Sequence, residues 1–211
     1  MFRKALLTTA AAIAMFALSS VARADTVTLT GINGTGVTAT ITNYSLVGNT
    51  FTFTINNTST GSTTGTITNI GFALPGSRPN NYTLTSSTNS NYSLVFDLNA
   101  TSGSQNLVSS FDLVLTDKQN GNVTFGGGSV NLGIAPGTSA TFTITGDFSG
   151  LTADQIAHDI FARFQNVNPG GSDVATPGNP NPVPEPMTMI LFGTGLAGVA
   201  ARARRRRNSK G

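Results

Sequence analysis

The amino-acid sequence predicts an all-β domain: an antiparallel two-sheet β-sandwich, of jelly-roll or immunoglobulin-like type, with one short helix near its end. Two observations lead to this fold class. Apolar and polar residues alternate with a period of two over much of the chain after residue 25, and turn-forming clusters of Gly, Asn, Pro and Ser interrupt the alternation about every ten residues. Short strands joined by such turns are typical of antiparallel sandwiches and barrels, and one half-buried face per strand favours the two-sheet sandwich.

Each strand is expected to have one apolar face and one hydroxyl-bearing face. In residues 49–55, Phe51, Phe53 and Ile55 fall on one side and three threonines on the other, because side chains alternate across a strand. Rows of threonine are therefore expected to cover the outside of the sandwich. The same alternation predicts strands over residues 26–30, 36–42, 92–98, 110–116, 129–134 and 140–146.

The segment 67–75 does not keep a single phase. Ile67 has one parity, whereas Ile70 and Leu74 have the other. One extra residue in a strand reverses the alternation of side chains, so the pattern predicts a β-bulge or a strand end near Asn69.

One short helix is expected after the last of these strands. Thr152 is a suitable N-cap, and Gln155 three residues later completes a capping box. Leu151 and Ile156 occupy the two positions of a hydrophobic staple. These residues therefore predict where the helix begins.

The β domain is assigned to residues 25–167. Its last strand is expected over residues 160–167, which return to apolar alternation after the helix. Residues 168–182 are rich in Pro, Gly and Asn without apolar periodicity. Such a composition predicts a linker between the domain and the C-terminal tail.

Residues 1–24 have the organisation of a secretory signal peptide. Arg3 and Lys4 precede an apolar stretch, and Ala22 and Ala24 form an A-x-A cleavage site before Asp25. A membrane-spanning first helix is the alternative, but the apolar stretch is shorter than the ~20 residues that a span requires. The chain has no cysteine, so disulfide scaffolds and thiolate chemistry are excluded.

The basic composition does not indicate nucleic-acid binding. Of the 12 Lys and Arg residues, nine lie before residue 25 or after residue 201. Between Asp25 and Asp173 the chain carries three basic residues against eight aspartates, a net charge of −5. Binding of phosphates requires cations that cluster on the folded surface, and the predicted domain lacks such a cluster.

The sequence indicates little catalytic chemistry. His158 is the only histidine. The chain therefore offers few ligands for a zinc site and a single candidate for the histidine of a Ser-His-Asp triad. Calcium binding, or hydrolysis by paired carboxylates, would have to use aspartates near loop ends. No catalytic residue, metal ligand or cofactor is assigned. A hydrolytic pair would have to be two aspartates, and the aspartates that could meet at a calcium site are Asp97, Asp112, Asp117, Asp147 and Asp173.

The C-terminal residues form a motif of three parts. Pro184-Glu185-Pro186 is followed by residues 187–201, which are uncharged and would span about 22 Å as a helix. This length is short for a permanent membrane anchor, although an ordinary anchor remains the alternative. Basic residues at the end of the chain are expected to stay on the cytoplasmic side and to stop translocation: Arg202, Arg204, Arg205, Arg206 and Arg207.

This tail, residues 183–211, resembles the PEP-CTERM protein-sorting signal of Gram-negative bacteria. The resemblance implies that an exosortase, a membrane-embedded transpeptidase, recognises Pro184, Glu185 and Pro186 and cuts near them. It also implies that residues 187–201 enter the membrane only transiently as a sorting helix. The protein would then reach the cell surface or an extracellular matrix that contains exopolysaccharide.

Two classes of function are compatible with the predicted domain. One is a non-enzymatic surface or matrix protein that contacts exopolysaccharide through its polar faces and through Tyr44, Tyr82 and Tyr92. The alternative is a secreted hydrolase that uses aspartates. A self-assembling adhesion protein is a further possibility, because strand edges with few charges can pair with one another.

Overall fold

The structure is a computed structural model, and it describes the β domain of the chain. The described residues are 26–76, 78, 80–102, 105–117, 125–168 and 170–178, and at 97–102, 105–107 and 109 only the backbone is described. The predicted signal peptide and sorting tail therefore lie outside the described residues.

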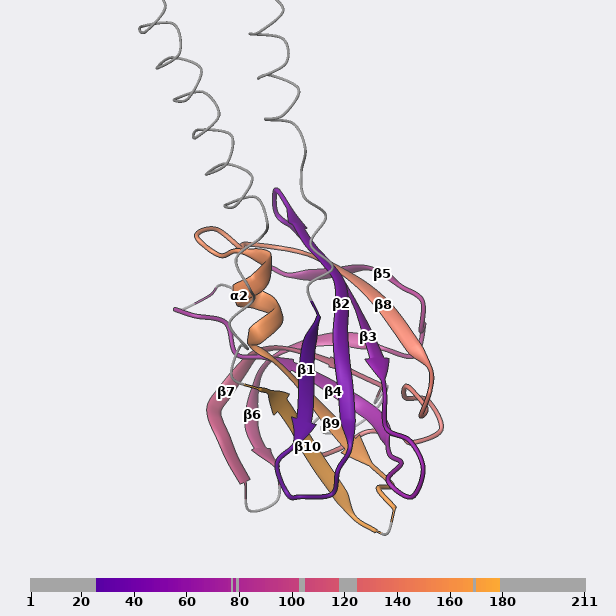
Figure 1. Cartoon of the computed structure of the whole chain (residues 1–211). Helices are drawn as coiled ribbons and strands as arrows, with labels where there is room; N and C mark the ends of the chain where they lie inside the picture. The colour runs from indigo at the N-terminus through magenta and orange to yellow at the C-terminus, as the bar shows by residue number, and fades with distance from the viewer. Residues whose placement is uncertain are drawn as a thin grey trace, which may run out of the picture. The chain divides into compact units, whose positions relative to one another are not determined.

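The described residues form ten strands and one short helix (Figure 1). The helix is α2, Ala153–His158. The strands are β1 (Val27–Gly31), β2 (Thr38–Val47), β3 (Thr50–Asn57), β4 (Thr66–Phe72), β5 (Thr83–Ser87), β6 (Ser93–Ser102), β7 (Gln105–Thr116), β8 (Ser139–Thr145), β9 (Ile160–Gln165) and β10 (Ser172–Pro177).

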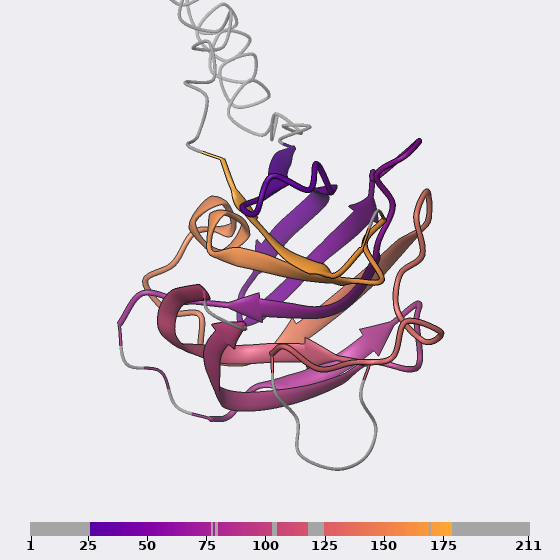
Figure 2. The same ribbon diagram turned by 90° about the horizontal axis from the view of Figure 1, so that it is seen from below.

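The prediction of a two-sheet sandwich is wrong. All ten strands belong to one antiparallel sheet, in the order β5-β8-β3-β2-β1-β10-β9-β4-β7-β6. This sheet rolls into a nearly closed, barrel-like shape (Figure 2). A rolled sheet buries one face of every strand, as a sandwich does, so alternation alone cannot distinguish the two folds. Twist and β-bulges supply the curvature.

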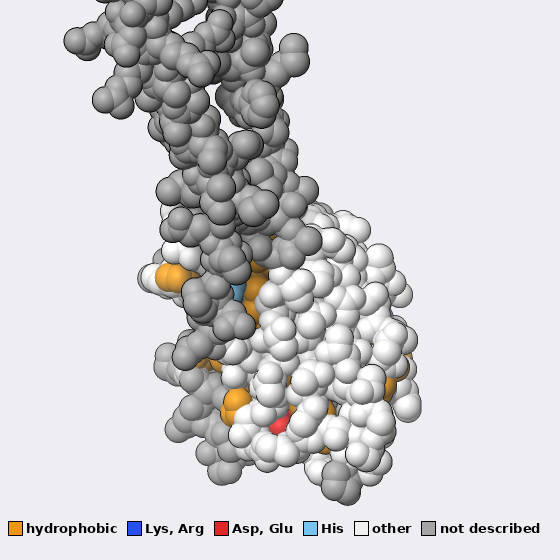
Figure 3. All heavy atoms as spheres, viewed as in Figure 1, with side chains coloured by type: hydrophobic (Ala, Val, Ile, Leu, Met, Phe, Trp, Pro, Cys, Tyr) orange, Lys and Arg blue, Asp and Glu red, His pale blue; other side chains and the backbone are white. Residues whose placement is uncertain are grey.

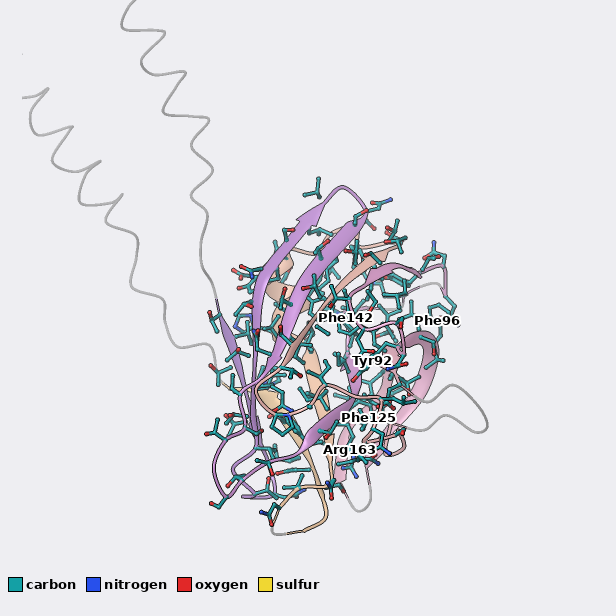
Figure 4. The ribbon with its side chains drawn as sticks, turned by 90° about the vertical axis from the view of Figure 1, so that its right-hand side faces the viewer. Tyr92, Phe96, Phe125, Phe142 and Arg163 are labelled. Carbon is teal, nitrogen blue, oxygen red and sulfur yellow. The ribbon has the colours of Figure 1, made fainter. Side chains whose placement is uncertain are left out.

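The apolar faces of the strands meet inside the roll, as the alternation predicted. Phe51, Phe53 and Ile55 are fully buried, and the rings of Phe53 and Phe142 stack with centroids 5.6 Å apart. Tyr92 packs edge-on against Phe142 at 5.2 Å (Figure 4). The core is thus a cluster of aromatic and aliphatic side chains without any cysteine.

Two local predictions are confirmed. The register between β4 and β9 shifts between Ile67 and Asn69, where the change of phase predicted a bulge. The hydroxyl oxygen of Thr152 accepts the backbone N–H of Gln155, and the side-chain oxygen of Gln155 accepts the backbone N–H of Thr152. These two hydrogen bonds form the predicted capping box at the start of α2.

The linker prediction is wrong over part of its length. Strand β10, Ser172–Pro177, lies inside the stretch 168–182 and pairs with both β1 and β9. The stretch 129–134 was predicted as a strand, but only Ile134 forms a bridge there, to Ile67. Strand β5 was not predicted. It is an edge strand of five Ser, Thr and Leu residues, which has too little apolar content to alternate visibly.

Candidate functional site

The predicted site residues of the two termini lie outside the described residues. They are Ala22, Ala24 and Asp25 of the cleavage site, Pro184, Glu185 and Pro186 of the sorting motif, and Arg202, Arg204, Arg205, Arg206 and Arg207 of the membrane stop. The structure does describe where the domain meets each of these segments.

Both ends of the domain leave it at the same end of the sheet. Strand β10 runs antiparallel to β1, with Pro177 opposite Leu29. The N–H of Gly178 then donates to the carbonyl oxygen of Thr28 at 3.1 Å. Five residues, 179–183, separate Gly178 from the sorting motif, so the motif follows the folded sheet closely.

Asp173 is a buried structural carboxylate that the sequence placed in the linker. Its side chain is 0 % exposed. It accepts the backbone N–H of Asn33 at 3.2 Å and the side-chain N–H of Asn33 at 2.9 Å. The hydroxyl of Thr35 and the backbone N–H of Val174 donate to it as well. Asp173 therefore fixes the turn between β1 and β2 against β10.

The other aspartates lie at separate places and hold separate loops. Asp112 accepts the backbone N–H of Leu74 at 2.8 Å, and Asp147 accepts that of Ser149 at 3.0 Å. Asp97 lies in β6, where only the backbone is described. Among the residues with described side chains, no group of three His, Cys, Asp or Glu residues could hold a metal ion.

Asp117, at the end of β7, lies beneath a glycine-rich segment. Its Oδ1 accepts the backbone N–H of Ser129 at 2.8 Å, whereas its buried Oδ2 has no hydrogen-bond partner in the structure. Burial raises the pKa of Asp117 to about 6, against the opposing effect of the Ser129 N–H. The side chain thus favours the protonated state more than an exposed aspartate does.

The glycine-rich segment, residues 125–134, packs on the outer face of β4. Asn69 donates to the carbonyl oxygens of Phe125 and Gly127. Gly128 adopts a φ of +125°, and a Cβ at this position would lie 2.8 Å from Oδ1 of Asp117. Gly128 therefore allows the backbone of this segment to pack closely against Thr68 of β4 and Asp117.

A buried arginine lies beside this segment. Arg163 on β9 is the cross-strand neighbour of Asn69 and donates to the hydroxyl of Ser172. Its Nε and the Oδ1 of Asn69 are both buried without a hydrogen-bond partner in the structure. Burial lowers the pKa of Arg163, and the nearby charge of Asp173 opposes that change.

Two of the three tyrosines predicted to contact sugars are core residues. Tyr82 and Tyr92 are each 5 % exposed, and their hydroxyls donate to the carbonyl oxygens of Asp147 and Ile67. Tyr44 is half-buried and donates to Oδ1 of Asp154 at 2.6 Å. His158 contacts the Asp154 carbonyl oxygen within α2, which is a local helix contact.

Threonines form an ordered array on the outer face of β2, β3 and β8, as predicted. The hydroxyls of three cross-strand pairs lie within hydrogen-bond distance: Thr50 and Thr145 at 3.3 Å, Thr52 and Thr143 at 3.2 Å, and Thr54 and Thr141 at 2.9 Å. Asn56 continues the array by donating to Thr40 and Thr42. Figure 3 shows the face of the domain around β1, β2 and β3, where charged side chains are nearly absent.

An apolar tail that ends in arginines follows the all-β domain closely in the sequence and has the three parts of a C-terminal sorting signal. Residues 182–206 match the family model of the PEP-CTERM protein-sorting motif. The chain therefore carries a PEP-CTERM motif in its C-terminal tail, as the resemblance predicted. The motif implies processing by an exosortase, export and sorting to the cell surface.

The other comparisons do not extend this assignment to the β domain. Comparison with curated proteins gave no match, and comparison with solved structures gave none either. The described part of the chain contains no helix with the length and apolar character needed to cross a membrane.

Proposed function

We propose that the chain is a non-enzymatic protein of the cell surface or extracellular matrix, in which the rolled β domain contacts exopolysaccharide. The observation that carries this proposal is the PEP-CTERM motif, which follows a domain with an uncharged threonine array. In the proposed sequence of events, the signal peptide is removed before Asp25. The tail then holds the protein in the membrane until an exosortase cuts near Pro184-Glu185-Pro186.

The threonine array supports a neutral polysaccharide as the contact of the domain. Each hydroxyl pair uses one proton internally and keeps a second proton and free lone pairs for an outside partner. The β-branched side chains are stiff at χ1, so little conformational entropy is lost on binding. Residues 36–57 carry no charged side chain, which favours hydroxyl groups over ionic groups as binding partners.

The structural use of the aspartates supports a non-enzymatic role. A hydrolase with paired carboxylates requires two that face one reaction centre. Asp173 holds the turn after β1, Asp112 the backbone after β4, and Asp117 the glycine-rich segment. Each of these carboxylates is thus occupied by a backbone or side-chain donor of a different loop.

Fractionation of the producing cells tests the proposal. Replacement of Pro184, Glu185 and Pro186 by alanine is expected to leave the protein uncut in the membrane fraction, whereas the parent protein is recovered from the surface and matrix. Replacement of Thr52 and Thr143 by valine keeps the side-chain shape and removes two hydroxyls. This variant is expected to be processed normally but to be lost from the polysaccharide fraction, and its retention there would contradict the role of the array.

A further inference from the structure

The domain is tied closely to the predicted membrane segment. Strand β10 extends the folded domain to Pro177, so only residues 179–186 separate Gly178 from Met187, where the apolar run begins. Eight residues can span at most about 28 Å. While the tail is in the membrane, the end of the domain at Gly178 must therefore lie within this distance of the bilayer.

A hairpin projects beyond this end of the domain. Val27 at the start of β1 pairs with Ile41, but β2 continues as far as Val47, which pairs with Thr50. Six further residues, one of them taken up by the bulge, extend about 15–20 Å at ~3.3 Å per residue. Figure 1 shows the hairpin of β2 and β3 extending past the start of β1. Its tip therefore projects from the end of the sheet at which Gly178 lies beside Thr28.

The tip presents an exposed apolar side chain. Val47 is 75 % exposed, more than any other large hydrophobic residue among those described. Gly48 and Asn49 beside it are exposed and uncharged. A single exposed valine is ordinary on a protein surface, but this one lies at the tip of the hairpin that projects beyond the start of β1.

We infer that the β2–β3 hairpin tip, residues 46–49, contacts the lipid surface while the sorting tail is inserted. The inference rests on the proposed function, because it requires the tail to enter the membrane. The projection of the hairpin, about 15–20 Å, is shorter than the largest reach of residues 179–186. A flexible chain of eight residues has a root-mean-square length of about 14–17 Å, and a spacer of this length brings Val47 to the lipid. Two aspartates lie near the tip. Asp147 follows Gly146, whose backbone N–H donates to the carbonyl oxygen of Asn49, and Asp154 accepts the hydroxyl of Tyr44. Anionic lipids would repel these carboxylates, so the contact is expected with neutral headgroups.

The absence of cysteine from the chain allows a direct test. A single cysteine is introduced as Val47→Cys, or as Ser62→Cys in the exposed connection between β3 and β4 at the opposite end of the sheet. Each is labelled with an environment-sensitive fluorophore in the full chain and reconstituted with phosphatidylcholine vesicles. Flotation reports insertion of the tail, and quenching by spin-labelled lipid reports contact of each site with the bilayer.

The label at position 47 is expected to show blue-shifted emission and at least threefold stronger quenching than the label at position 62. Insertion of twenty Gly and Ser residues after Gly178 is expected to reduce quenching at position 47 by at least half. Flotation with equal, weak quenching at both sites overturns the hairpin contact and leaves the sorting function intact. Failure to float overturns insertion of the tail, and with it the inference.

Discussion

The backbone N–H of Gly178 donates to the carbonyl oxygen of Thr28 at 3.1 Å, which joins the last described residue before the sorting tail to the first strand of the domain. Because β10 lies between β1 and β9, residues 172–177 belong to the interior of the sheet. The folded domain thus extends to the immediate neighbourhood of the sorting motif, and processing must take place close to folded protein.

Truncation tests where the domain ends. A fragment of residues 26–167 lacks β10, so β1 and β9 each lose a paired neighbour and apolar surface is exposed. We expect this fragment to show no cooperative thermal unfolding by circular dichroism. A matched fragment of residues 26–178 is expected to unfold in one cooperative transition. Equal stability of the two fragments would show that β10 is dispensable.

Asp173→Asn tests the buried carboxylate. The substitution removes the negative charge that strengthens the hydrogen bonds from Asn33, Thr35 and Val174. The new asparagine side chain also places an N–H donor among these donors, where it lacks an acceptor. We expect the free energy of unfolding to fall by about 2–4 kcal/mol, measured by urea denaturation. Asp154→Asn, at an exposed hydrogen bond, is the control and is expected to change it by less than about 1 kcal/mol.

The glycine-rich segment gives a matched pair of substitutions. Gly128→Ala places a Cβ against Thr68 and Asp117 at a φ of +125°, and we expect a loss of about 2–4 kcal/mol in unfolding free energy. Gly126→Ala meets no atom within 4 Å, so a change of less than about 1 kcal/mol is expected. Similar effects of the two substitutions would contradict the close packing of this segment on β4.

Asp117 predicts a dependence of stability on pH. Its pKa is raised to about 6 in the folded protein, so the folded state binds the proton more tightly than the unfolded state does. Stability is therefore expected to increase as pH falls through 6, by about 1 kcal/mol between pH 8 and pH 5. Urea denaturation at both pH values measures it. In Asp117→Asn this component of the pH dependence should be absent, and an unchanged pH profile would contradict the assignment.

The sequence was sufficient to predict the buried and exposed faces of most strands. The alternation around Phe51 and Phe53, the bulge near Asn69 and the capping box at Thr152 all depend on neighbours a few residues away. Such local patterns are the same in every all-β arrangement of these strands. Whether the strands form one rolled sheet or two packed sheets depends on pairings between distant strands, to which the alternation is insensitive.

The errors fall where tertiary contacts outweigh local composition. Strand β10 is short and flanked by Gly and Pro, but it gains two neighbours in the sheet and buries Val174 and Ala175. The fixed position of Asp173 depends on Asn33, 140 residues earlier in the chain, so no spacing rule reveals it. The sorting motif was predictable because its three parts are adjacent in the sequence.

Intact-mass measurement of the protein recovered from the surface and matrix of the producing cells tests the central claim most directly. We expect a polypeptide that begins at Asp25 and ends near Glu185, with or without an attached group at its new C-terminus. Recovery of the complete chain of 211 residues from the cytosol, with neither end cut, would contradict the account.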